Sequence, residues 1–177
     1  PTHASSTMRK ACLEPITFNP DGTIPEVEMT TQGAGGPISP FYRMEAARAC
    51  LMSGHVMVTV RRPEHDIPVE YLAGIRDGGY AYWKYYDFSD SGVGHFVCKT
   101  WGQNLAVRIG IRLDSPKGEL IGVCDIDPMQ GETAYAIHRT KIREVTGRHA
   151  LVLVFKALDE KDKGKDLLNL EWFRFEK

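Results

Sequence analysis

The chain has 177 residues, 42% of them hydrophobic and 25% charged, a composition typical of a globular domain. Its 22 basic and 23 acidic residues leave a net charge of −1, without the basic excess that nucleic-acid binding requires. No apolar run approaches the roughly 20 residues that span a bilayer. Composition and charge therefore predict neither a nucleic-acid partner nor a membrane partner.

The length suffices for one hydrophobic core, with or without an appended segment. Because the chain begins at Pro1 rather than at Met, we expect a processed chain or an excised fragment. Its four cysteines are Cys12, Cys50, Cys98 and Cys124. They form no C-x-x-C pair, which argues against zinc and thioredoxin-like chemistry. Cys98 and Cys124 lie in strand-like runs and are predicted to be small buried hydrophobic residues; a disulfide is left open.

The first forty residues differ from the rest. Residues 11–30, "ACLEPITFNPDGTIPEVEMT", predict two strands around a turn at 19–22. Residues 30–40 are dense in Gly and Pro and predict a linker, so we place a domain boundary near residue 40. Two strands are not stable alone, so this extension must pack on something. Residues 43–54 can be interpreted as one short helix.

Beyond the linker, short runs rich in Val, Ile, Tyr and Phe alternate with Gly, Pro and Asp breaks. These runs are 55–62, 79–88, 94–100, 105–114, 118–126, 134–142, 149–158 and 167–175. The run "VRIGIRL" alternates as a half-buried antiparallel strand does. One of its faces carries Arg108, Gly110 and Arg112. The charged stretch 159–166 is expected to be the solvated end of a hairpin. Many short strands predict an all-β, antiparallel β-sandwich of jelly-roll type over residues 41–177.

Five sequence blocks stand in a distinctive order and spacing. They are "YRMEA" (42–46), "GIRDGGYAYWKYYDF" (74–88), "IRLDSPKGELIG" (111–122), "VTGRHALVLVF" (145–155) and "NLEWFRF" (169–175). Together they resemble a family 6 carbohydrate-binding module over residues 42–177. The opening segment 8–33, "MRKACLEPITFNPDGTIPEVEMTTQG", resembles the last strands of a family 43 glycoside hydrolase, a five-bladed propeller that often carries this module at its C-terminus.

The resemblance implies the C-terminal part of an arabinofuranosidase or xylosidase, secreted or periplasmic, next to its propeller domain. The implied ligand is a plant cell-wall polysaccharide or oligosaccharide of xylan or arabinan type. Glycoside hydrolysis needs two positioned carboxyl groups, which in family 43 come from earlier blades. The acids Asp21, Glu26 and Glu28 are explained by a turn and a solvated strand face, so we expect no hydrolysis by this chain alone. One alternative is a structural module without sugar affinity. Another is that the chain belongs to an enzyme that is active only when its other part is present.

The resemblance also implies where sugar would bind. On a strand, Tyr80 and Tyr82 point the same way, and in the family this is a concave outer face that serves some members as a sugar site. Both tyrosines can equally be ordinary cross-strand partners. The alternation is expected to break near Lys84 and Tyr85. The residues predicted to pack in the core are Trp83, Tyr86 and Phe88.

The main family site lies at one edge of the sandwich, where an Asn anchors a sugar between two rings. Asn169 matches that Asn, but Gly74 stands where the first ring belongs, and Glu132 or Thr133 where the second does. An amide alone gains little in water, so this site is expected to be weak. Trp101, expected in a loop, either supplies a ring or plugs the end of the sandwich.

A structural calcium is the remaining family feature. Its carboxylates would be Glu45 and Glu171, while Ala47 replaces a third. Calcium takes six to eight oxygen ligands, several of them anionic, so we expect weak binding or none. The six histidines show no metal-binding spacing, and no other cofactor is expected.

Overall fold

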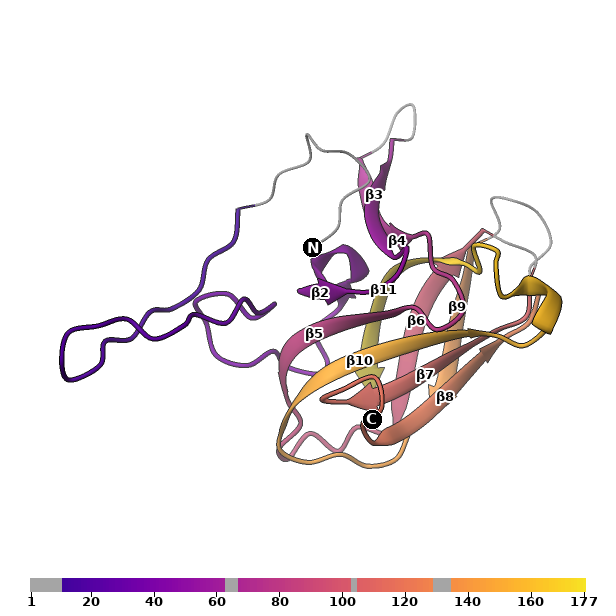
Figure 1. Ribbon diagram of the computed structural model, residues 1–177. Helices are drawn as coiled ribbons and strands as arrows, with labels where there is room; N and C mark the ends of the chain where they lie inside the picture. Colours follow the sequence, from indigo (N-terminus) through magenta and orange to yellow (C-terminus); the bar gives the residue numbers. More distant parts are fainter. Residues whose placement is uncertain (1–10, 63–66, 103–104, 129–134) are drawn as a thin grey trace.

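The computed structural model describes residues 11–62, 67–102, 105–128 and 135–177. Two antiparallel sheets pack face to face (Figure 1). Sheet A has the order β3 (Met57–Arg61), β4 (Val69–Ala73), β11 (Asn169–Glu176), β6 (His95–Trp101) and β9 (Tyr135–Lys141), and β1 (Met44–Glu45) also pairs with β11. Sheet B has the order β2 (Leu51–Met52), β5 (Tyr80–Asp87), β10 (Arg148–Ala157), β7 (Val107–Leu113) and β8 (Leu120–Ile126). The predicted antiparallel β-sandwich is confirmed.

The core is built around aromatic rings contributed by both sheets. The ring of Phe173 on β11 lies 4.7 Å from that of Trp83 on β5 and 5.7 Å from that of Phe96 on β6, measured between centroids. Trp83, Tyr86 and Phe88 are fully buried, as predicted. The alternation along β5 therefore changes face between Trp83 and Tyr86. The peptide bond between Lys84 and Tyr85, inside that interval, is cis.

Two connecting segments differ from their predicted forms. Residues 43–54 form β1, a short 3-10 turn η1 (Ala46–Arg48) and β2 instead of one helix, because the backbone of β1 pairs with β11. The charged stretch 159–166 is not a hairpin end, because β10 and β11, which it joins, lie in different sheets. It contains the 3-10 turn η2 (Glu160–Asp162). Strand β4 was missed from the sequence because it is short and only one of its residues is buried.

Residues 11–30, here called the arm, project away from the sandwich (Figure 1). The predicted turn is present, closed by a hydrogen bond from the Asn19 amide to the Thr23 carbonyl at 2.8 Å. The two predicted strands are wrong, since no residue of the arm is in a strand. The Glu14 side chain, which accepts from the Thr30 amide at 2.7 Å, joins the two halves where a backbone ladder would. The exposed apolar side chains of the arm are Leu13, Ile16, Phe18, Ile24, Val27 and Met29.

Cys50, Cys98 and Cys124 are not joined in disulfides. Cys98 and Cys124 are buried in the core, as predicted. A hydrogen bond to the Cys124 thiol, together with burial, raises the pKa of Cys98 well above its usual value. Across the described residues, no helix has the length and apolar character of a membrane span.

Because Phe173 contacts rings from both sheets, Phe173→Ala is expected to lower the free energy of unfolding by about 3–5 kcal/mol. Urea denaturation followed by tryptophan fluorescence measures this loss. Tyr86→Phe is the matched control, because the buried Tyr86 hydroxyl has no hydrogen-bond partner within the described chain. Removing that hydroxyl keeps the ring and should leave stability unchanged or slightly raised. A loss below about 1 kcal/mol for Phe173→Ala would contradict the central role of this ring.

Candidate functional site

The outer face of sheet B carries a row of residues that crosses four strands. It consists of Tyr80 on β5, Val154 on β10, Gly110 on β7 and Val123 on β8, which face one another in the strand pairings. Neighbouring strands lie about 4.8 Å apart, so the row extends roughly 14 Å. It is thus long enough for an oligosaccharide to lie along it.

Gly110 leaves a hollow in this row, here called the basic hollow. It has an apolar floor made by Val123 and Val154. Its rim is formed by Arg108, Arg112, Leu120 and Lys156. The basic residues of the rim were not among the predicted site residues. The signal that could have found them is the "VRIGIRL" run, in which a glycine stands between two arginines on one face.

Of the two predicted tyrosines, Tyr80 is the one that this face presents. Tyr82 is only 9% exposed and packs against Ala150 and Val152 of β10. This burial raises the pKa of Tyr82. Tyr80 is half-buried, and its ring lies edge-on to that of Tyr82 with centroids 5.7 Å apart. Tyr82 therefore holds Tyr80 in place, and the exposed part of the Tyr80 ring remains available for contact.

Glu28 of the arm binds two side chains in the second half of β5. The Tyr85 hydroxyl donates to Glu28 Oε2 at 2.6 Å, and the Lys84 ammonium pairs with the other carboxylate oxygen. These bonds, from Lys84 first and Tyr85 second, lower the pKa of Glu28. The Arg148 guanidinium lies 4.6 Å from the centroid of the Tyr85 ring. Glu28 was expected to be merely solvated; it instead ties the arm to sheet B.

The edge position implied by the family pattern is shaped by two glycines. Gly74 has a φ of +62°, and a Cβ added there would lie 2.3 Å from the His55 carbonyl oxygen. No ring-bearing residue fits this backbone. Asn169 begins β11, and a Cβ on Gly102 would come within 2.7 Å of its side-chain nitrogen. The second ring position, Glu132 or Thr133, lies outside the described residues.

Trp101 is the last residue of β6 rather than part of a loop. It belongs to an aromatic cluster with Tyr71 and Tyr135, at centroid distances of 4.8 and 5.9 Å. Basic side chains already cover parts of these rings: Arg61 lies over Trp101 and Tyr135, and Lys99 lies 4.4 Å from the centroid of Tyr135. Trp101 and Asn169 are paired across the β6–β11 ladder, so the structure brings these two predicted residues together.

The two predicted calcium ligands are each paired with a basic side chain. Glu45 accepts from Arg43 Nη2 at 2.7 Å, and the buried Glu171 accepts from Lys99 Nζ at 2.9 Å. Within the described part of the chain, no group of three or more acidic, Cys or His side chains is placed to hold a metal ion. The residues present therefore do not fit the calcium site that the family pattern implies.

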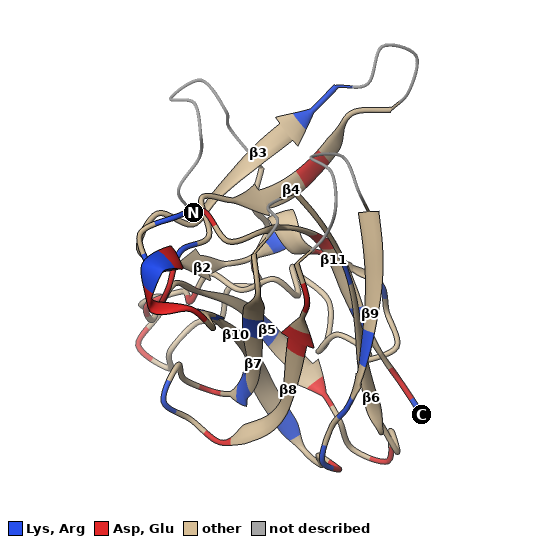
Figure 2. Ribbon diagram, turned by 90° about the vertical axis from the view of Figure 1, so that its right-hand side faces the viewer, with Lys and Arg blue, Asp and Glu red and all other residues tan. Residues whose placement is uncertain are grey.

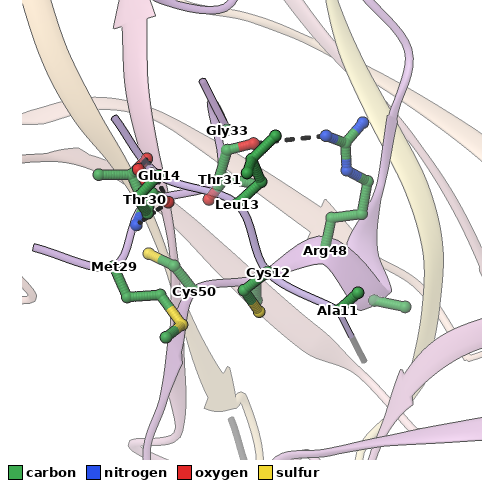
Figure 3. Close-up of a pocket in the computed structure, with 12 residues that line it drawn as sticks. Ala11, Cys12, Leu13, Glu14, Met29, Thr30, Thr31, Gly33, Arg48 and Cys50 are labelled. Atoms are coloured by element: carbon green, nitrogen blue, oxygen red, sulfur yellow. Dashed lines mark hydrogen bonds between the residues drawn. The ribbon is translucent and has the colours of Figure 1, made fainter. Parts of the chain in front are cut away.

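A further hollow lies where the arm meets η1 and β2 (Figure 3). Its lining includes Cys12, Met29 and Cys50, and no aromatic residue. The Arg48 guanidinium beside it donates to the Thr31 carbonyl at 3.4 Å. Without a ring to stack on a sugar, this hollow is best interpreted as a seam between the arm and the sandwich.

Charged residues of both signs are interspersed over the ribbon (Figure 2). Ion pairs with a partly buried member include Lys84–Glu28, Lys99–Glu171 and Lys165–Asp162. The described surface therefore resembles a mixed one rather than a single basic stripe.

Comparison with known proteins identifies the family. Residues 45–177 match the carbohydrate binding module family 6. The chain belongs to this family. A family 6 carbohydrate-binding module from Clostridium cellulolyticum, solved in complex with xylose, superposes with a TM-score of 0.67 at 30% identity. That alignment covers 79% of this chain and all of the other. The sandwich described above is thus a carbohydrate-binding module.

Two longer proteins also align with this carbohydrate-binding module and its arm. They are the arabinoxylan arabinofuranohydrolases of Paenibacillus polymyxa and Bacillus subtilis, at 25% and 22% identity. Each alignment covers 97% of this chain, but only 27% and 33% of the two longer proteins. The relationship is distant and includes the arm.

The backbone at Gly74 provides a first test of the edge region. Gly74→Ala should lower the free energy of unfolding by about 2 kcal/mol more than Gly78→Ala, measured by urea denaturation. Both glycines have positive φ, of +62° and +78°, but a Cβ on Gly78 would meet nothing within 4 Å. Gly78→Ala therefore carries only the conformational cost of about 1–2 kcal/mol. Equal losses in the two variants would show that the edge has room for a side chain.

Calcium provides a second test. The thermal midpoint of unfolding should be the same in excess EDTA and in millimolar calcium chloride, because Glu45 and Glu171 already have basic partners. Differential scanning calorimetry measures it, with magnesium chloride as the control for ionic strength. If calcium bound the folded chain, a calcium concentration 100 times the dissociation constant would raise the free energy of unfolding by about 2.7 kcal/mol. A rise of several degrees specific to calcium would therefore contradict this prediction.

Proposed function

We propose that this chain is the non-catalytic C-terminal module of a family 43 hydrolase acting on arabinoxylan, and that it binds xylan-type chains on the outer face of sheet B. The alignment of 97% of the chain with two arabinoxylan arabinofuranohydrolases supports the parent enzyme. The xylose complex of the related Clostridium cellulolyticum module supports the class of sugar. Because such a polymer lies outside the cell, we place the protein in a secreted or periplasmic setting.

The observation that carries this proposal is the row headed by Tyr80. A pyranose ring has an apolar C–H face, which an aromatic ring or an apolar strand surface can cover. Tyr80 presents part of its ring beside Val154 and Gly110 in one continuous row. The Tyr80 hydroxyl and the Arg112 guanidinium stand near this row as donors to sugar hydroxyls.

The alternative is a structural module that positions or completes the propeller without its own sugar affinity. Two observations favour it. The backbone at Gly74 excludes one stacking ring of the edge site. The arm exposes six large apolar side chains, which would be covered if the arm continued a neighbouring domain. Both functions can coexist, because the arm and the Tyr80 row are different surfaces.

Titration with xylo-oligosaccharides and arabinoxylo-oligosaccharides, followed by NMR, tests the binding function. Shifts are expected for amides around Tyr80, Val154 and Gly110. Tyr80→Ala should weaken binding about five- to tenfold, since a ring–sugar contact is comparable to other aromatic contacts of about 1–1.5 kcal/mol. Tyr80→Phe is the matched control, because it keeps the ring and should retain most of the affinity.

Shifts confined to Asn169 and Trp101 would instead place the ligand at the edge of the sandwich and refute the Tyr80 row. If no amide shifts up to millimolar sugar, the structural alternative stands.

A further inference from the structure

The basic hollow carries more positive charge than binding a neutral sugar requires. Arg108, Arg112 and Lys156 stand around its rim, against one carboxylate, Asp125, paired opposite Arg108. The valine side chains of the floor are apolar, so the charges surround an apolar patch. An apolar floor with cations at its rim suits a ligand that is flat, partly apolar and anionic.

The three cations differ in how far they are already neutralised. Arg108 is held by Asp125 through two hydrogen bonds, of 2.7 and 2.8 Å. Arg112 uses Nη1 to donate to the Gly118 carbonyl at 2.7 Å, which orients the guanidinium without cancelling its charge. The Lys156 side chain is exposed and makes no hydrogen bond or ion pair to any described residue. Arg112 and Lys156 therefore remain as the cations available to a ligand.

We propose that the basic hollow binds the carboxylate of a uronic acid substituent, so that this module prefers an acidic, glucuronic-acid-bearing xylan over an unsubstituted one. The proposal rests on the proposed function and deepens it. Tyr80 contacts a neutral sugar of the backbone, and the substituent lies over Val154 and Gly110. Its carboxylate accepts hydrogen bonds from Lys156 and Arg112. Both units lie along the one row.

The absence of a side chain at Gly110 leaves the space that this proposal assigns to the acidic sugar. A Cβ at Gly110 would lie 3.6 Å from Leu120 Cδ1 and 3.7 Å from the Val154 carbonyl oxygen, which are ordinary contact distances. The backbone there does not require glycine, yet a side chain would fill the hollow. Gly110→Val is therefore expected to fold and to occupy the space that we assign to the acidic sugar.

The test compares three ligands on the whole chain by isothermal titration calorimetry. The first is a xylo-oligosaccharide with one glucuronic acid side group, the second is the same oligosaccharide without it, and the third is an oligogalacturonide. The first should bind about fivefold more tightly than the second, as one or two exposed ion pairs allow. The difference should shrink as salt is raised. The third should bind no better than the second, because it lacks the neutral backbone.

Two variants locate the effect. Lys156→Gln and Gly110→Val should each remove the preference for the acidic ligand. Lys141→Gln, an exposed lysine on β9 of the other sheet, is the matched control and should leave the preference unchanged. Dispersed amide spectra of each variant confirm that it is folded.

The outcomes separate the two proposals. Equal affinity for the first two ligands, with loss on Tyr80→Ala, overturns the uronic acid inference and leaves the proposed function intact. A preference that survives Lys156→Gln and Gly110→Val overturns the assignment to this hollow. Tightest binding by the oligogalacturonide would show a general acidic-polymer site and also overturns it. No binding by any ligand refutes both proposals.

Discussion

The contact between Trp83 of β5 and Phe173 of β11 joins the two sheets, and the surface of sheet B depends on it. Side chains alternate along a strand, so seating Trp83 in the core turns Tyr80 and Tyr82 outward. The change of face before Tyr86 then leaves Lys84 and Tyr85 half-buried in the second half of the strand, where they bind Glu28. One strand thus supplies core packing, the face that we propose for binding and the anchor of the arm.

Much of the fold follows from sequence patterns with strong physical causes. The alternation in "VRIGIRL" predicts both faces of β7, and the buried rings of β5 were correctly assigned. The short strands were harder, because β1 and β2 have two residues each and are held by pairing with distant strands. The prediction of two strands in the arm failed for a related reason. The local sequence pattern favours strands, but the Glu14 side chain takes the place of a backbone ladder.

The candidate site was predictable only in part, because binding surfaces depend on contacts between distant residues. Tyr80 and Tyr82 look equivalent in the sequence, yet packing against Ala150 and Val152 covers only Tyr82. Gly74 and Gly110 look equivalent too. Gly74 is required because the His55 carbonyl lies against it, whereas Gly110 has ordinary space around it. One glycine thus closes the edge position to a ring, and the other opens a hollow.

The arm and the proposed binding face are linked through the backbone of β5. The Thr31 amide donates to the Lys84 carbonyl at 2.8 Å, and the Ile38 amide donates to the Tyr85 carbonyl at 2.7 Å. With the Glu28 bonds, these contacts fix the base of the arm next to Tyr82. A domain packed on the exposed apolar side chains of the arm would therefore have a set orientation relative to the Tyr80 row. A sugar chain held on that row would then be presented to such a domain in one direction, which a freely tethered module could not do.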